Sequence, residues 1–69
     1  MAAYESNVRA HRERAGMSQE ALARKVDVSR QTIVNIEQGQ SEPKVFLALA
    51  LAAVFGVAVS ELFRRTPVS

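Results

Sequence analysis

A short segment near the middle of the chain, SRQTIVN at residues 29–35, carries side chains of the types that bind the edges of DNA bases. Glutamine and asparagine can form paired hydrogen bonds with adenine, arginine can do so with guanine, and the threonine methyl group can contact thymine. Such side chains near the start of a helix suit a helix that enters the major groove of double-stranded DNA. The candidate base-reading residues are Arg30, Gln31, Thr32 and Asn35.

The residues around this segment predict two short helices joined by a tight turn. Ser18 is a good N-cap for a helix that continues to about Val26, and Ser29 caps a second helix that Gly39 ends. Asp27 tolerates the left-handed backbone that the turn between them needs. Two short helices joined by about three residues have the geometry of a helix-turn-helix motif, which we place at residues 18–38.

Three more helices are predicted on either side of this motif. The first spans about residues 5–15, the fourth has Pro43 in its first turn and runs to Phe55, and a last short turn or helix spans residues 59–63. The expected fold is therefore all-α with five short helices. The 69 residues are enough for one small domain, residues 1–69, in which we expect residues 1–3 and 66–69 to be frayed.

Composition argues against several other functions. The net charge of +2 is a mild basic excess, which permits nucleic acid as a partner without requiring it. With no cysteine and one histidine, the chain has no basis for a disulfide or a zinc site, and we expect no cofactor and no metal. Serine, histidine and acidic residues are not arranged for nucleophilic chemistry, so we expect no enzyme. The single histidine, His11, is expected to be a half-buried packing residue.

Membrane insertion is also not expected. The start of the chain has no apolar core of a signal peptide, because it carries Glu5, Asn7, Arg9 and Arg12. The apolar run at residues 45–59 is shorter than the roughly 20 residues that a membrane helix needs, and it contains Gly56. We therefore expect a cytoplasmic protein.

Longer motifs point to a known family. MSQEALARKVDVSRQTIVNIEQG resembles the helix-turn-helix of the Cro and phage-repressor type, also called the xenobiotic-response-element family, and the order S-Q-x-x-L-A, S-R-Q-T-I and I-E-x-G is specific. The following segment, EPKVFLALALAAVFGVAVSELF, resembles the fourth and fifth helices of small stand-alone bacterial members. The resemblance implies a lambda-repressor-like fold that binds double-stranded DNA and regulates transcription.

The resemblance also implies roles for individual residues. Gln19, at the start of the second helix, would meet a DNA phosphate. Arg12 and Glu37 stand where the family commonly pairs an arginine of the first helix with the glutamate that ends the third, so they are expected to form a structural salt bridge. The remaining candidates for phosphate contact are Ser29, Gln38 and Lys44.

Four positions depart from the family pattern, which usually has other residues there. His11 replaces a leucine, Asp27 a glycine, Ala21 a glutamate and Ala58 a serine cap. By the general rules for caps and turns each change costs about 0.5–1 kcal/mol of stability. None lies on the expected DNA surface, so the departures concern stability and leave the expected function unchanged.

The fourth predicted helix has more apolar residues than a core needs. Its inward face would hold Val45, Ala48, Leu49, Leu51, Ala52 and Phe55. The family usually has polar residues at three outward places, where this chain has a stripe of Phe46, Ala50 and Ala53. An exposed apolar stripe with an aromatic residue usually marks a contact surface, and Leu62, Phe63 and Val68 are candidates to lie near it. The alternative is that Phe46 folds against the last helix or the tail.

One copy of such a domain would make few phosphate contacts and bind DNA weakly. We therefore expect a homodimer that binds a near-palindromic operator and represses by occupying a promoter. An antitoxin or a restriction-controller protein of the same fold remains open. So does a protein-interaction adaptor that does not bind DNA, although Arg30 and Gln31 argue against it.

Overall fold

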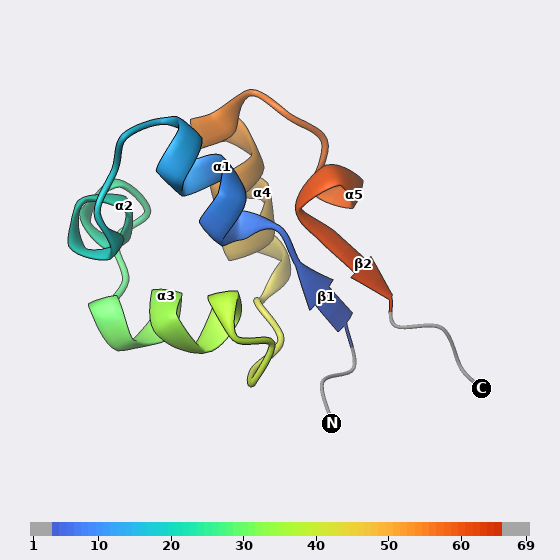
Figure 1. The fold of residues 1–69 in the computed structure, drawn as a ribbon. Helices are drawn as coiled ribbons and strands as arrows, with labels where there is room; N and C mark the ends of the chain where they lie inside the picture. The colour runs from blue at the N-terminus through green and yellow to red at the C-terminus, as the bar shows by residue number, and fades with distance from the viewer. Residues whose placement is uncertain (1–3, 66–69) are drawn as a thin grey trace.

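The structure is a computed structural model and describes residues 4–65. Five helices follow one another along the chain, and a short strand stands at each end of the described region (Figure 1). The fold class predicted from the sequence, a five-helix lambda-repressor-like domain, is confirmed. No helix in residues 4–65 is long and apolar enough to cross a membrane. The elements are β1 (Tyr4–Ser6), α1 (Val8–Arg14), α2 (Gln19–Lys25), α3 (Arg30–Glu37), α4 (Val45–Phe55), α5 (Val59–Leu62) and β2 (Phe63–Arg65).

The two helices of the central motif begin and end as their capping residues predict. The hydroxyl of Ser18 accepts a hydrogen bond of 3.0 Å from the backbone N–H of Ala21, and that of Ser29 accepts one of 3.1 Å from Thr32. Each bond satisfies an N–H that the first turn of a helix leaves unpaired. Between the helices, Asp27 has the expected left-handed backbone, with φ of 57°.

The prediction for the start of α4 is wrong, because the helix begins after Pro43 and does not include it. Lys44 is the N-cap and the helix begins at Val45, so Pro43 lies before the helix and not in its first turn. The lysine side chain makes no capping hydrogen bond. Pro43 still keeps the helix from extending further toward the N-terminus, because the residue before a proline avoids the helical backbone region.

The described ends of the chain form strands, which include residues 5, 6 and 63 of the predicted helices. β1 pairs antiparallel with β2, and Ser6 stands opposite Phe63. Asn7 extends the junction, because its backbone N–H donates to the carbonyl of Leu62 at 2.8 Å and its side-chain amide donates to that of Glu61 at 3.2 Å. The first helix therefore starts at Val8 and not at residue 5, and the last helix ends before Phe63. The predicted frayed segments, residues 1–3 and 66–69, lie outside the described residues.

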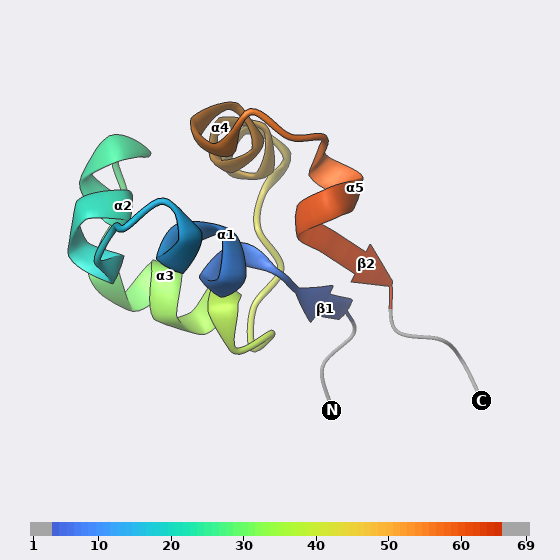
Figure 2. The same ribbon diagram turned by 45° about the horizontal axis from the view of Figure 1, so that its top comes forward.

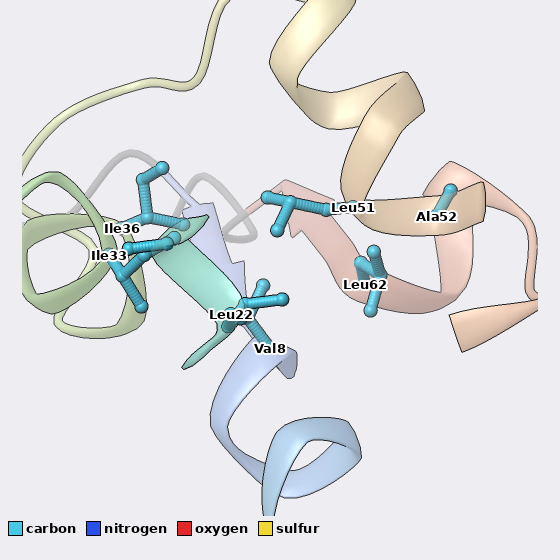
Figure 3. Packing of buried hydrophobic residues seen from close by; sticks show 8 residues of the cluster. Val8, Leu22, Ile33, Ile36, Leu51, Ala52 and Leu62 are labelled. Carbon is cyan, nitrogen blue, oxygen red and sulfur yellow. The ribbon is translucent and has the colours of Figure 1, made fainter. Parts of the chain in front are cut away.

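A single apolar core holds the five helices together, and Figure 3 shows side chains from separate helices pointing toward one another. The largest fully buried side chains come from every helix, namely Val8, Leu22, Ile33, Ile36, Leu51 and Leu62. Burying a side chain of this size contributes about 1.5–3 kcal/mol. Ala23 is also buried, where α2 packs closely against α3. The core thus fixes the position of α3 relative to α2, which a helix-turn-helix motif requires.

The outward face of α4 differs from the predicted one. Val45 and Leu49, expected to point inward, are 71% and 51% exposed, whereas Phe46 is 85% exposed as an outward residue should be. Of the other predicted stripe members, Ala53 is exposed and Ala50 is half-buried.

The residues on the buried side of α4 explain why Val45 and Leu49 are exposed. It is formed by Ala48, Leu51 and Ala52, and two small alanines allow the helix to approach the core closely through that side. With this side buried, Val45 and Leu49 turn to the surface. The exposure of Phe46 excludes the alternative in which it folds against α5, and the burial of Leu62 removes that residue from any free surface.

Candidate DNA-binding surface

The two views of the molecule show α2 at one end, the β1–β2 sheet at the other, and α3 running along one side between them (Figures 1 and 2). This arrangement leaves the outer side of α3 uncovered by any other described element. Ile33 and Ile36 hold the opposite side of α3 in the core. The predicted base-reading residues therefore share one element, on which Arg30 and Gln31 are exposed and Thr32 and Asn35 are half-buried.

Within this surface, a hydrogen bond links the side chains of Gln31 and Asn35. Nε2 of Gln31 donates a hydrogen bond of 3.0 Å to Oδ1 of Asn35, one helical turn further on. The bond uses one of two amide hydrogens on the glutamine and leaves its oxygen free. Gln31 can therefore still offer the donor and acceptor pair that adenine needs, while Asn35 restrains its orientation.

The start of α3 is ordered by a second local interaction. The hydroxyl oxygens of Ser29 and Thr32 lie 2.9 Å apart, within hydrogen-bonding distance, and Ser29 also caps the helix. The Ser29 hydroxyl is thus engaged within the protein, although its residue is exposed at the helix start. Its expected phosphate contact would have to share that hydroxyl with the cap.

A buried ion pair lies behind the predicted phosphate contacts. Nε of Arg12 approaches Oε2 of Glu37 to 2.7 Å, and Nη1 of the same arginine donates to the carbonyl of Met17 at 2.8 Å. The two charged side chains are only 11% and 4% exposed. Arg12 and Glu37, which the resemblance pairs, thus join α1, the α1–α2 connection and α3.

Gln19 belongs to the same network, which the sequence did not reveal. Its Nε2 donates a hydrogen bond of 3.1 Å to Oε1 of Glu37, so part of its amide points to the ion pair. The second amide hydrogen of Gln19 remains for a phosphate. Gln19 and Gln38 also line one polar recess between α1, α2 and α3, with a volume of about 350 Å³. The family resemblance points to Gln19 as a phosphate contact, but its hydrogen bond to Glu37 is visible only in the three-dimensional arrangement.

Phe46 lines a second recess, which the sequence did not predict. Together with Lys44, Thr32 and Val28 it lines an apolar recess of about 380 Å³ between α3 and the start of α4. Lys44 is exposed at this point. The predicted phosphate residue at the start of α4 therefore stands beside α3, and Phe46 stands beside both.

Comparisons with known proteins agree with this geometry. A family model described as helix-turn-helix matches residues 8–62, which covers all five helices. A transcriptional regulator of the helix-turn-helix type from Archaeoglobus fulgidus is 43% identical over 58 residues, which are 84% of this chain and 83% of the relative. A second such regulator, from Methanocaldococcus jannaschii, is 47% identical over 47 residues, which are 68% of this chain and 71% of the relative.

Among solved structures, the restriction-modification controller protein C.AhdI from Aeromonas hydrophila superposes with a TM-score of 0.75. It shares 32% sequence identity, and the match covers 83% of this chain and 86% of the controller. The match of the family model over residues 8–62, together with these relatives, shows that the chain belongs to the Cro/C1-type helix-turn-helix family of DNA-binding transcriptional regulators.

Proposed function

We propose that this protein binds double-stranded DNA sequence-specifically as a homodimer and represses transcription from promoters that contain a near-palindromic operator. The observation that carries the proposal is the uncovered side of α3. Four residues of base-reading type lie on this helix, with Arg30 and Gln31 exposed and Thr32 and Asn35 half-buried. The buried residues Ile33 and Ile36 fix its position against the rest of the domain. Each good paired contact with a base contributes about 1–3 kcal/mol of discrimination.

Phosphate contacts would fix this helix in the groove. Gln19 stands at the start of α2 and Lys44 at the start of α4, and Ser29 and Gln38 stand at the two ends of α3. These positions surround the base-reading side chains, so contacts from them would set the angle and depth of α3. Such contacts supply affinity for any DNA sequence, whereas base contacts supply the choice among sequences.

A second copy would make up for the small number of cations in this surface. Arg30 and Lys44 are the cationic members of the proposed contact set, and each neutralised phosphate adds only about 0.9 to the salt slope of binding. Two copies on one duplex combine their binding free energies. Their α3 helices would then occupy half-sites about 34 Å apart, which requires a near-palindromic operator.

One other role is favoured by a specific observation. The similarity to the controller C.AhdI extends over most of both chains, so a restriction-controller role is the second candidate. It shares the DNA-binding step and differs in the regulated genes. An adaptor that does not bind DNA is less favoured, because Arg30 and Gln31 are exposed on the motif and no described residue pairs with the guanidinium group of Arg30.

Selection from random double-stranded DNA with the purified protein tests the proposal. We expect an enriched motif with two-fold symmetry and half-sites one helical turn apart. A variant with Arg30→Ala and Gln31→Ala should lose the enrichment, while Arg14→Ala, which removes a charge from the exposed end of α1, should keep it. If the wild-type protein enriches no motif even at low salt, it is not a sequence-specific regulator. A reporter with the selected operator across its promoter then tests the sign of regulation, and repression requires that expression falls.

A further inference from the structure

The surface at the sheet end of the molecule contains a groove that the DNA-binding site does not use. It has a volume of about 600 Å³ and lies between the start of α4, α5 and the β1–β2 sheet. We name it the α4–sheet groove. Its apolar wall includes Val45, Leu49, Val59 and Phe63, and two residues of opposite charge, Glu42 and Arg65, also line it.

Apolar exposure concentrates along this groove. Val45 is 71% exposed and Leu49 is 51% exposed, and they stand one turn apart on α4. With Phe46 on the neighbouring side of the helix, they are the large apolar residues that the described chain leaves most open. A continuous apolar surface of this kind marks an interaction site more often than isolated exposed residues do.

The charges at the groove indicate what kind of partner fits. In residues 4–65 the ion pairs are Arg9–Glu13 and Arg12–Glu37, so neither Glu42 nor Arg65 is paired there. In a two-fold symmetric interface every contact occurs twice. If one residue of the first copy meets a second residue of the partner, then the second residue of the first copy meets the first residue of the partner. An apolar surface that carries one acid and one base can therefore match a second copy of itself, because the acid of each copy can face the base of the other.

We propose that the α4–sheet groove is the surface through which two copies of this chain associate, with Val45 and Leu49 in the apolar centre and Glu42 of each copy facing Arg65 of the other. The proposal rests on the homodimer of the proposed function and names its surface. It places the interface on the Val45 and Leu49 side of α4, and not on the stripe of Phe46, Ala50 and Ala53 expected from the sequence.

The position of Glu42 is fixed by contacts within the chain. The hydroxyl of Tyr4 donates a hydrogen bond to the carbonyl of Ser41, which ties the loop before α4 to β1. Tyr4 stands opposite Arg65 in the sheet, so this tie brings the loop with Glu42 to the strand that carries Arg65. Burial, and secondarily the charge of Glu42, raises the pKa of the Tyr4 phenol, which agrees with a carboxylate close to it. An interface whose charges are already in place loses less entropy on association.

This surface is compatible with DNA binding. The sheet lies at the end opposite α2 in both views, and α3 lies between them (Figures 1 and 2). Two copies joined at their sheet ends would leave both α3 helices open. A standard interface buries about 800 Å² on each partner, roughly a sixth of the 4822 Å² surface of this chain, so the exposed part of α4 must contribute together with the groove.

Exchange of the two charges is the central experiment. The Glu42→Arg protein would place two like-charged pairs in its own dimer, and so would the Arg65→Glu protein. We expect each of them alone to dissociate at least about tenfold more readily than wild type in sedimentation equilibrium. In an equimolar mixture, both cross-interface pairs become attractive in the mixed dimer, which should form in preference. A charge contact within one chain could not be restored by mixing, so a mixture no more dimeric than its components overturns the charge pairing.

The apolar centre is tested by a matched pair of variants on the exposed side of α4. Leu49→Glu should convert the dimer to a monomer, whereas Phe46→Glu, which adds the same charge one turn earlier and beside α3, should leave it dimeric. Circular dichroism and thermal unfolding check that both remain folded. If Phe46→Glu dissociates and Leu49→Glu does not, the interface is the stripe expected from the sequence. A wild-type protein that is monomeric at every concentration reached overturns the proposal directly.

A DNA measurement separates this proposal from the proposed function. The monomeric Leu49→Glu protein should still bind a single half-site as wild type does, and should lose only the cooperative binding of the full operator. A wild-type dimer that dissociates as expected on Leu49→Glu but selects no DNA sequence would overturn the proposed function and leave the interface standing. Loss of half-site binding in the folded Leu49→Glu protein would show that the groove is part of the DNA surface, against the proposal.

Discussion

The side-chain amide of Gln19 donates a hydrogen bond of 3.1 Å to Oε1 of Glu37, the carboxylate that Arg12 holds from α1. Gln19 is the first residue of α2, where a phosphate contact is proposed, and Glu37 is the last residue of α3. The network therefore connects the proposed phosphate contact to the most buried ion pair of the described chain. One group of side chains holds three helices together and orients a residue of the proposed DNA surface.

Loss of Glu37 should destabilise the fold strongly. We expect Glu37→Ala to lower the free energy of unfolding by about 3 kcal/mol, because it leaves the buried guanidinium group of Arg12 without its partner. Chemical denaturation followed by circular dichroism measures this change. In a small domain with a thin stability margin, the loss should be visible as partial unfolding at moderate temperature.

Two controls separate the buried charge from a general effect of substitution. Glu13→Ala breaks the ion pair with Arg9, whose side chains are 54% and 70% exposed, and should change stability by less than about 1 kcal/mol. A combined Arg12→Met and Glu37→Leu protein should be more stable than Glu37→Ala, since it leaves no buried charge unpaired. A double variant less stable than Glu37→Ala would show that the hydrogen bonds of the network add to the free energy of unfolding, beyond the neutralisation of one buried charge by the other.

Gln31 and Gln19 should affect DNA binding in different ways. Gln31→Ala should reduce the preference for the selected operator over a sequence altered at one position by about 1–3 kcal/mol, because a base contact is removed. Gln19→Ala should weaken binding to both sequences equally, because a phosphate contact is removed. Titration of both DNA sequences with each variant measures the difference. Equal loss on every sequence for both variants would mean that α3 does not read the bases.

The elements around the motif could be predicted from sequence because their signals are local. Ser18 and Ser29 cap helices through the side chain of a single residue, and Asp27 marks the turn by its own backbone preference. The five-helix fold and the family followed from these signals and from the order of motifs. The inward positions Ile33 and Ile36 were likewise evident from helical spacing.

The features that the sequence did not reveal depend on residues far apart in the chain. β1 and β2 are three residues each, too short for a pattern of alternation, and they exist because the two ends of the described chain meet. The exposed side of α4 could not be identified from an all-apolar helix, since every side looks equally suitable for the core. Gln19 is separated from Glu37 by most of the motif, so their hydrogen bond has no local signal.

Lys44 should contribute to the salt dependence of DNA binding. It is exposed at the start of α4, beside the recess that Thr32 and Phe46 line, and so stands next to α3, the proposed base-reading helix. Lys44→Ala should reduce the slope of log K against log salt concentration by about 0.9 for each copy bound. Arg14→Ala, which removes a charge from the exposed end of α1, should leave the slope unchanged. An unchanged slope for Lys44→Ala would remove Lys44 from the phosphate contacts.

A single substitution should stabilise the protein without touching the DNA surface. Ala58 is the N-cap of α5 and has the extended backbone of a capping residue, with φ of −75° and ψ of 151°, but it has no side-chain oxygen to accept a hydrogen bond. Ala58→Ser supplies that oxygen and should raise the free energy of unfolding by about 1 kcal/mol. Ala58→Val, which adds bulk without an acceptor, serves as the control and should give no gain. Because α5 leads directly into β2, equal stability of the serine and alanine proteins would mean that the sheet, and not the cap, holds this short helix in place.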